Sequence, residues 1–253
     1  MFSVAYVDRL RAYEIGKIAT FFERGQRVLE IGAGTGMQAL ALSRLGFEVT
    51  AIEVPNSTYA DDRVFPITDY DGRHIPLADA SVDVVFSSNV LEHVPDLPQI
   101  HREIRRVLKA GGYCIHVLPT HSWRLWTILT ALPDAVVYAI AALPQLAPRA
   151  MPNRPELDRL GRAWQKTIGQ VGGQVVQRRH GEHGNVISEL WLFNPRWWIR
   201  NFTENGFVVV HDEPMGLFYT GNKLFGRALS FAMRERLARV LGSACHLFKV
   251  APA

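Results

Sequence analysis

The fold is decided by the stretch VLEIGAGTGMQALALSRLGFEVTAIEV, residues 28–54. An apolar run leads into three glycines, Gly32, Gly34 and Gly36, and a helix-like pattern follows them. A second, β-branched apolar run then ends at the acidic Glu53. A glycine-rich turn between a strand and a helix is typical of nucleotide sites in parallel α/β sheets. The stretch therefore predicts a strand–turn–helix–strand unit that binds a nucleotide-like ligand at its turn.

Strand and helix patterns alternate on both sides of this unit. The alternation is regular over residues 27–118 and resumes near the C-terminus, which predicts a parallel α/β sheet with right-handed crossovers. We expect one domain made of residues 1–119 and 191–253, beginning with a helix in 1–24, and an inserted region at 120–190. The expected strands are 27–31, 47–54, 63–67, 82–88, 113–119, 207–213 and 244–250, and the expected helices are 4–23, 36–46, 97–112, 195–206 and 222–241.

The composition is that of an ordinary folded protein. Hydrophobic residues make up 48% and charged residues 21% of the chain, which suffices for a buried core and argues against disorder. The net charge of +4 comes without a dense Lys/Arg stripe, so we expect no nucleic-acid partner. The N-terminus lacks an apolar signal core, which predicts a cytoplasmic location. Cys114 and Cys245 lie in apolar runs and are expected to be buried thiols.

The glycine turn differs from a pyrophosphate-binding turn. The dinucleotide fingerprint is G-x-G-x-x-G, and its third glycine would fall at Met37 in this chain. Glu30, two residues before the first glycine, would repel a pyrophosphate but would hold an ammonium group. Glu53 sits at the end of the second strand, where a carboxylate accepts hydrogen bonds from ribose hydroxyls. A purely steric glycine turn would leave both acids unexplained.

The turn and its two acids resemble the class I S-adenosylmethionine-dependent methyltransferases. Residues 71–119, DGRHIPLADASVDVVFSSNVLEHVPDLPQIHREIRRVLKAGGYCIHVLP, are similar to the branch of that family that includes the ubiquinone and menaquinone biosynthesis methyltransferases. The resemblance covers residues 27–118, most closely at LEHV and VLKAGG, but not the insertion. It implies a Rossmann-like, doubly wound α/β fold, with a mostly parallel seven-stranded sheet, one antiparallel C-terminal strand and, here, a capping insertion. It also implies S-adenosyl-L-methionine as the cofactor and S-adenosyl-L-homocysteine as its product.

The resemblance assigns roles to further residues. In the related branch an Asp shortly before an apolar–Pro step meets the adenine amino group, and the matching position here is Asp71, with Asp69 as the nearby alternative. Asn89 and Val90 occupy the strand end that faces the sulfonium. The expected cofactor-binding residues are Glu30, Gly32, Ala33, Gly34, Gly36, Glu53, Val54, Asp71, Gly72, Asn89 and Val90.

Candidate catalytic residues lie in two segments. Methyl transfer from a sulfonium needs mainly alignment of the acceptor, and a general base is required only for a proton of high pKa, as on a hydroxyl. His93 follows the fourth strand, where ligands bind in such sheets, unless it only bonds the next loop. In RRHGEHGN, residues 178–185, His180, Glu182 and His183 form either a base with its orienting carboxylate or a solvated polar loop. The spacing matches no zinc pattern, so no metal is expected.

The most apolar stretch, residues 122–148, lies in the insertion. Pro133, Asp134 and Pro144 interrupt it, so we expect two short helices rather than a membrane-spanning helix. Three roles fit this composition: a lid over the substrate pocket, a segment resting on a membrane surface, or a dimer interface. The second role would place the protein peripherally at the inner face of the membrane, with a lipid-linked acceptor.

The expected activity is methyl transfer, and the expected reaction is O-methylation of a hydroxyl. The acceptor would be a small, moderately apolar molecule or one linked to a glycan or lipid. Methylation of a carbon or nitrogen on a quinone-like or amine acceptor is the alternative within the same class. The alternative from a different class is a partner subunit that binds S-adenosyl-L-methionine (SAM) without turnover. The retained acids and the His-rich loop argue against this alternative.

Overall fold

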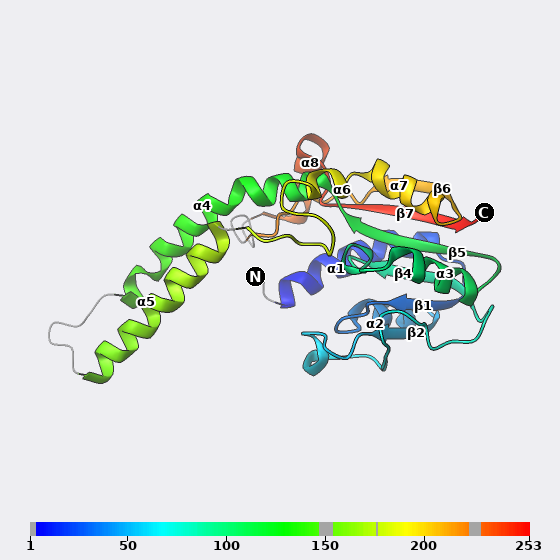
Figure 1. Cartoon of the computed structure of the whole chain (residues 1–253), viewed down its shortest axis with the longest axis horizontal. Helices are drawn as coiled ribbons and strands as arrows, with labels where there is room; N and C mark the ends of the chain where they lie inside the picture. The colour runs from blue at the N-terminus through cyan, green and yellow to red at the C-terminus, as the bar shows by residue number, and fades with distance from the viewer. Residues whose placement is uncertain (1–3, 147–153, 176, 223–228) are drawn as a thin grey trace.

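The computed structural model describes residues 4–146, 154–175, 177–222 and 229–253. Their centre is a sheet of seven strands in the order β3-β2-β1-β4-β5-β7-β6. Figure 1 shows this sheet with helices on both sides and a long helical arm that projects from the body of the molecule. The strands are β1 (Arg27–Ile31), β2 (Glu48–Glu53), β3 (Ile67–Asp69), β4 (Val82–Ser88), β5 (Leu108–Pro119), β6 (Phe207–Pro214) and β7 (Cys245–Pro252).

The strand directions confirm the expected doubly wound sheet. β1 pairs in parallel with β2 and β4, and the parallel pairing continues outward to β3 and β5. β7 pairs antiparallel with both β5 and β6, so β7 runs against its neighbours and β6 runs with the rest of the sheet. The carboxyl ends of β1, β2 and β4 therefore meet at one edge, where open α/β sheets bind their ligands.

Side chains of the central strands alternate between two cores, as the pleat requires. Leu29 and Val85 pack on one face against α3 (Leu97–Val107) and α7 (Pro195–Glu204). Val28 and Val84 pack on the other face against α1 (Val4–Ile18) and α2 (Met37–Arg44). Both Cys114 and Cys245 are buried free thiols, as expected.

Caps and prolines account for where two of these helices begin. The Asp96 side chain accepts a hydrogen bond from the Gln99 N–H at the start of α3, and the Asn194 side chain accepts one from the Arg196 N–H at the start of α7. Each cap is followed by a proline within the first helical turn. These are strong helix-start signals, and they fix the two helices that cover the same face of the sheet.

Several expected boundaries were wrong. The third strand is residues 67–69 rather than 63–67, because Pro66 removes the N–H that a ladder needs and pairing starts only after it. The helix expected to end at the glycines near 111 ends at Val107, and β5 starts at the next residue. Of the helix expected over 222–241, α8 covers Phe231–Leu241, and 223–228 lie outside the described residues.

The insertion forms one long helical hairpin and a loop. α4 is a single helix, His121–Leu146, of 26 residues with Pro133 and Pro144 inside it, so the prediction of two short helices was wrong. α5 (Arg154–Val175) runs back along α4, and their packing supplies tertiary support that the local sequence does not reveal. The chain then returns through the loop 177–188 and the short α6 (Glu189–Leu192) to the edge of the sheet.

Candidate active site

The glycine turn forms a tight cradle between β1 and α2. The N–H groups of Gly32 and Ala33 donate to the Ile52 carbonyl of β2 over 2.9 and 3.1 Å. Gly32, Gly34 and Gly36 have φ of +70°, +56° and +79°, which favour glycine. A Cβ on Gly32 would come within 2.4 Å of a methyl group of Val90. The turn therefore touches the segment after β4, and a side chain would fill the cradle.

The two acids of the opening stretch lie on either side of this turn. Glu53, at the end of β2, accepts hydrogen bonds from the N–H groups of Gly34 and Val54, each over 2.8 Å. Glu30 is buried within β1, and its Oε2 has no hydrogen-bond partner among the described residues. Burial, with the nearby Glu53 charge adding to it, raises the pKa of Glu30 to about 8. A positively charged group beside Glu30 would stabilise its carboxylate.

The loop after β3 brings Asp71 to the same edge of the sheet. The Tyr70 N–H donates to the Glu53 carbonyl over 3.0 Å, and a Cβ on Gly72 would lie 3.5 Å from Val54. The exposed Asp71 carboxylate accepts from the N–H groups of Arg73 and His74, and its pairing with the His74 ring holds its pKa well below the usual range. The alternative residue, Asp69, pairs instead with Arg63 over 2.7 Å.

Asn89 and Val90 lie at the carboxyl end of β4, next to the N-terminal helix. Asn89 has φ of +55°, and its N–H donates to the Val117 carbonyl over 2.8 Å. The side-chain oxygen of Asn89 accepts from the Arg11 guanidinium of α1 over 2.9 and 3.0 Å. Arg11 also pairs over 2.6 Å with Glu14, which is fully buried. α1 thus contributes charged groups to the same edge of the sheet.

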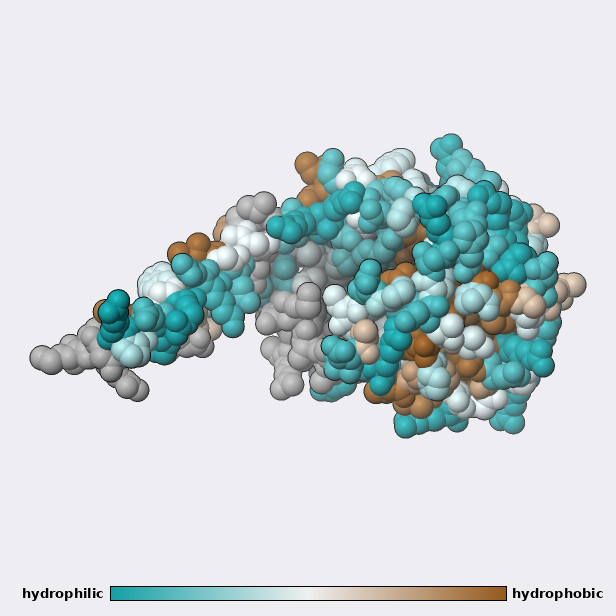
Figure 2. All heavy atoms as spheres, turned by 60° about the horizontal axis from the view of Figure 1, so that its bottom comes forward, coloured by the Kyte–Doolittle hydropathy of each residue, from teal (hydrophilic) through white to brown (hydrophobic). Residues whose placement is uncertain are grey.

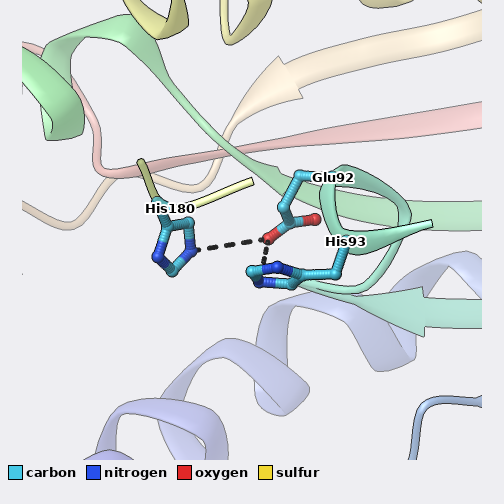
Figure 3. A group of neighbouring side chains, drawn as sticks. All are labelled: Glu92, His93 and His180. Atoms are coloured by element: carbon cyan, nitrogen blue, oxygen red, sulfur yellow. Dashed lines mark ion pairs between the residues drawn. The ribbon is translucent and has the colours of Figure 1, made fainter. Parts of the chain in front are cut away.

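A compact cluster of Glu92, His93 and His180 lies beside Val90. Glu92 and His93 belong to the 3₁₀ turn Leu91–His93 after β4, and His180 comes from the loop of the insertion (Figure 3). The Nε2 atoms of His93 and His180 are 3.8 and 3.9 Å from Glu92 Oε1. The ring of His180 also packs on Trp123, with 4.6 Å between the ring centroids. The insertion thereby adds a side chain to the site that the sheet begins.

Burial favours the uncharged form of every group in this cluster. It raises the pKa of Glu92 to about 8 and lowers the pKa of His180 to about 3. It also lowers the pKa of His93, against the opposing effect of the Glu182 charge. Perturbed groups of opposite shift in one cluster are typical of sites where protons or cations are handled.

A buried ion pair holds the loop that carries His180. Glu189 of α6 accepts hydrogen bonds from the N–H groups of His180 and Gly181, and its other oxygen lies 2.8 Å from Nε of Arg124 on α4. Arg124 also donates to the Arg178 carbonyl over 2.8 Å. The two charged side chains are 3% and 0% exposed, so this pair fixes the loop against the first turns of α4.

The remaining expected catalytic residues point elsewhere. Glu182 pairs with Arg179 over 3.3 Å, and its backbone N–H donates to the Glu92 carbonyl. His183 lies near the Val94 carbonyl, at 3.3 Å, and lines a small cavity against α7. His180 and His183 thus do not act on one group, whereas His180 and His93, far apart in the sequence, meet.

The sequence reasoning missed three contributors to this edge. Glu92 stands beside His93 in LEHV, and an acid next to a candidate base was a signal that could have been used. Arg124 was interpreted only as an anchor at one end of the apolar segment, although an Arg that becomes buried there needs a partner. Nothing in the sequence singled out Arg11, because the pattern of its helix is that of an ordinary amphipathic helix.

The comparisons with known proteins concern mainly the first half of the sheet. Residues 29–116 match a family described as a methyltransferase domain. An uncharacterized methyltransferase of Mycobacterium sp. (strain KMS) is 38% identical over 99 residues, which make up 36% of this chain and 38% of that protein. The chain thus matches little more than a third of the length of this relative.

Solved structures share the whole architecture at low sequence identity. A putative methyltransferase, solved in complex with the Haloferax volcanii Trm112 methyltransferase activator, has a TM-score of 0.56 at 15% identity and covers 96% of this chain and 90% of its own. A SAM-dependent methyltransferase from Aquifex aeolicus has a TM-score of 0.53 at 15% identity and covers 97% and 93%. These likenesses establish the fold.

Proposed function

Because residues 29–116 form a domain of the class I S-adenosylmethionine-dependent methyltransferase family, we propose that the protein methylates a hydroxyl of a small acceptor. One observation carries this proposal. The turn expected to hold the cofactor touches Val90, and Val90 directly precedes the turn that carries Glu92 and His93. The residues expected to hold the cofactor and those proposed to accept a proton thus share one edge of the sheet.

The donor set fits the cofactor. The three glycines leave the turn without side chains, so a ligand could approach its backbone closely. Glu30 offers a buried, unpartnered oxygen to the ammonium of the amino-acid tail. Two of the lone-pair sites on the Glu53 carboxylate are taken by backbone N–H groups, and the remaining ones are available to ribose hydroxyls. Asp71 and Gly72 follow β3 beside Val54, at the same edge of the sheet, and would meet the adenine.

The chain's own part in the reaction is alignment and proton removal. When bound, the cofactor supplies a methyl group on a positively charged sulfur, which already makes it a good electrophile. The acceptor hydroxyl has to lie behind that methyl group, and its pKa has to fall for it to become a nucleophile. The imidazoles of His93 and His180 are the part of the site that would accept this proton, because burial keeps both rings uncharged.

The cluster also favours oxygen over other acceptor atoms. An amine needs little help with proton removal, and neither does an activated quinone-like carbon. A buried carboxylate with two imidazoles is therefore best explained by an acceptor of high pKa. C- or N-methylation is the second candidate, and it would not require the cluster to remove a proton from the acceptor. A SAM-binding subunit without turnover would need no such cluster at all.

The projecting hairpin of α4 and α5 is the feature that favours a lipid-linked acceptor. α4 is long and apolar enough to span a membrane by length and composition alone, with 33% of its apolar window buried. Its first half is docked, however: Trp126 donates to the Leu241 carbonyl, and Asn222 donates to the carbonyl and hydroxyl oxygens of Thr127 and Thr130. The part of α4 that projects beyond these contacts, residues 132–146, would extend only about 22 Å, less than the roughly 30 Å of a hydrocarbon core.

An interfacial position suits this projecting part better than a spanning one. It exposes apolar side chains at helical spacing, and the neighbouring α5 carries exposed basic residues. Figure 2 shows apolar atoms scattered among hydrophilic ones on these projecting helices. Apolar residues beside basic ones are typical of helices that rest on anionic lipid surfaces. We therefore place the protein in the cytoplasm, peripherally at the inner face of the membrane. The exposed apolar residues are Leu132, Val136, Val137, Ile140 and Leu143 on α4, and the basic ones are Arg154, Arg162 and Lys166 on α5.

Calorimetry with S-adenosylmethionine tests the proposed function first. We expect binding to the wild-type protein, and a roughly 10- to 100-fold loss in Glu53→Ala, because hydrogen bonds to a charged group contribute about 1.5–3 kcal/mol. Absence of binding, or unchanged binding in the variant, would exclude the cofactor assignment. Labelled methyl transfer to hydroxyl, amine and quinone-like acceptors then tests the reaction. His180→Ala should bind the cofactor but lose transfer to hydroxyls, while His211→Ala, on β6, should retain both.

A further inference from the structure

The cluster beside Val90 has the composition of a metal site. Ligand atoms of Glu92, His93 and His180 all lie within 4.8 Å of one another, and both imidazoles turn a ring nitrogen toward the same carboxylate oxygen (Figure 3). Two imidazoles and one carboxylate are the ligand set of several catalytic metal sites, in which further positions stay open. The chain places these three side chains together from two segments that are distant in sequence.

The Glu92 carboxylate lacks the partners that its burial demands. Its side chain is 0% exposed, and neither oxygen has a hydrogen-bond partner among the described residues. A buried carboxylate is normally hydrogen-bonded, paired or bound to a metal. The histidine nitrogens at 3.8 and 3.9 Å are too far for the charge-assisted hydrogen bonds of about 2.7–2.9 Å that would satisfy it. The arrangement therefore calls for a group between these atoms.

The separations are close to those around a small cation. Ligands at about 2.0–2.1 Å from a tetrahedral centre lie roughly 3.3 Å from one another. The two distances to Glu92 Oε1 exceed this by about half an ångström, and all ligand atoms lie within 4.8 Å of one another, so the two rings have to move closer together around a cation. His93 and His180 are both partly exposed on their outer sides, so small side-chain rotations close the gap. The exposed side also leaves an approach for a further ligand.

We propose that Glu92, His93 and His180 bind one divalent transition-metal cation, of the class of Zn²⁺ or Fe²⁺, with an open position toward the acceptor. Imidazole ligands favour such cations over Mg²⁺ and Ca²⁺, which prefer oxygen ligands. The prediction of no metal rested on the spacing within residues 178–185 and on the lack of a supporting cysteine, and that segment supplies just one of the three ligands. Glu189 and Arg124 position His180 from behind through the backbone of its loop.

The cation would activate the acceptor hydroxyl, and this role rests on the proposed function. A cation at an open site binds a hydroxyl oxygen and lowers its pKa by stabilising the negative charge, and the proton passes to solvent. It also fixes the oxygen in position for the in-line approach. Binding of the cation itself depends only on the three ligands, so it is measured separately from methyl transfer.

Titration of the metal-free, tag-free full chain with Co²⁺, followed by visible absorption, tests the site, and calorimetry with Zn²⁺ gives its affinity. We expect one equivalent of Co²⁺ with ligand-field bands, and at least a 100-fold loss of Zn²⁺ affinity in His180→Ala and in Glu92→Gln. His211→Ala should retain the site, and Mg²⁺ should not compete. Circular dichroism checks that each variant is folded, and His180, on a surface loop, offers a replacement outside the core.

The outcomes separate the two proposals. No stoichiometric Co²⁺ binding, or equal binding in wild type, His180→Ala and His93→Ala, overturns the metal site. If the same protein still binds S-adenosylmethionine, the proposed function stands without the metal. If it binds the metal but not S-adenosylmethionine, the proposed function fails and the metal site stands.

Discussion

Gly32 and Val90 pack so closely that a Cβ on Gly32 would lie 2.4 Å from a Val90 methyl group. This contact joins the carboxyl ends of β1 and β4, the two halves of the site. The turn on one side carries the residues proposed to hold the cofactor, and the turn on the other side carries Glu92 and His93. If the proposed function holds, any change that separates them moves the methyl donor away from the acceptor.

Gly32→Ala is therefore expected to damage both stability and cofactor binding. The added Cβ meets Val90 and must adopt φ of +70°, so we expect a loss of about 2–4 kcal/mol in the free energy of unfolding from overpacking and backbone strain together. Gly25→Ala is the matched control, because Gly25 has φ of +79° with nothing within 4 Å of a Cβ. Urea unfolding should show a loss of about 1–2 kcal/mol there. Equal losses in the two variants would contradict the close packing.

Glu30 predicts a pH dependence of stability. Its folded pKa of about 8 lies above the ordinary value of 4.5, so the folded state holds a proton that the unfolded state releases first. Stability from this group is greatest below pH 4.5, falls as the pH rises toward 8 and is constant above it. The slope in that window approaches about 1.4 kcal/mol per pH unit.

Glu30→Gln removes this slope, which urea unfolding at several pH values measures. The wild type should lose stability relative to Glu30→Gln between about pH 5 and 8, and the difference should level off at higher pH. A constant difference across the range would show that Glu30 ionises normally in the folded protein. Bound S-adenosylmethionine should reduce the slope if its ammonium group pairs with the carboxylate.

The parts of the site that the sequence predicts are those close together along the chain. The glycine turn and the end of β2 fall within residues 28–54, where periodicity and turn chemistry are local signals. The cluster is different, because His180 joins His93 only through the fold of the insertion. The expectation that His180, Glu182 and His183 act together relied on sequence proximity, and the loop geometry separates them.

The helix α4 shows why the local sequence wrongly predicted two short helices in the insertion. Pro133 and Pro144 remove backbone donors and favour breaks in an isolated helix. α4 nevertheless runs through both, because α5 packs along it and Asn222 and Trp126 anchor its first half. These contacts involve residues far away in sequence, so no window of the sequence contains them.

The Arg124–Glu189 pair is expected to be essential for the position of His180. Removing one member leaves a buried charge without its partner, so Glu189→Ala should lower the free energy of unfolding by about 3–5 kcal/mol. The Kd for S-adenosylmethionine should change little, since the cradle lies elsewhere, while kcat should fall with the loss of His180 from the cluster. Urea unfolding, calorimetry and turnover measure the three effects separately.

Arg124→Met combined with Glu189→Met provides a second measurement, because an apolar pair leaves no unpaired charge and should recover part of the stability. It should not recover kcat, since the N–H groups of His180 and Gly181 lose their acceptor. The exposed pair Arg200–Glu204 is the control, with side chains 79% and 57% exposed. Glu204→Ala should alter stability by less than about 0.5 kcal/mol. A loss of stability in Glu204→Ala comparable to that in Glu189→Ala would mean that burial does not make the Arg124–Glu189 pair more important for stability.

The projecting part of α4 predicts binding to anionic vesicles. Leu132 and Ile140 are 62% and 61% exposed, and both change to Ser in the test variant. If these side chains enter the lipid surface, their loss should weaken co-sedimentation with phosphatidylglycerol-containing vesicles at least tenfold, given about 1.5–3 kcal/mol for full burial of each. Val240→Ser is the control, because Val240 is 83% exposed but lies on α8 in the body of the molecule. Equal vesicle binding by the two variants, or none by the wild type, would exclude the membrane role, and a concentration-dependent dimer lost in the test variant would show that a second copy covers the arm instead.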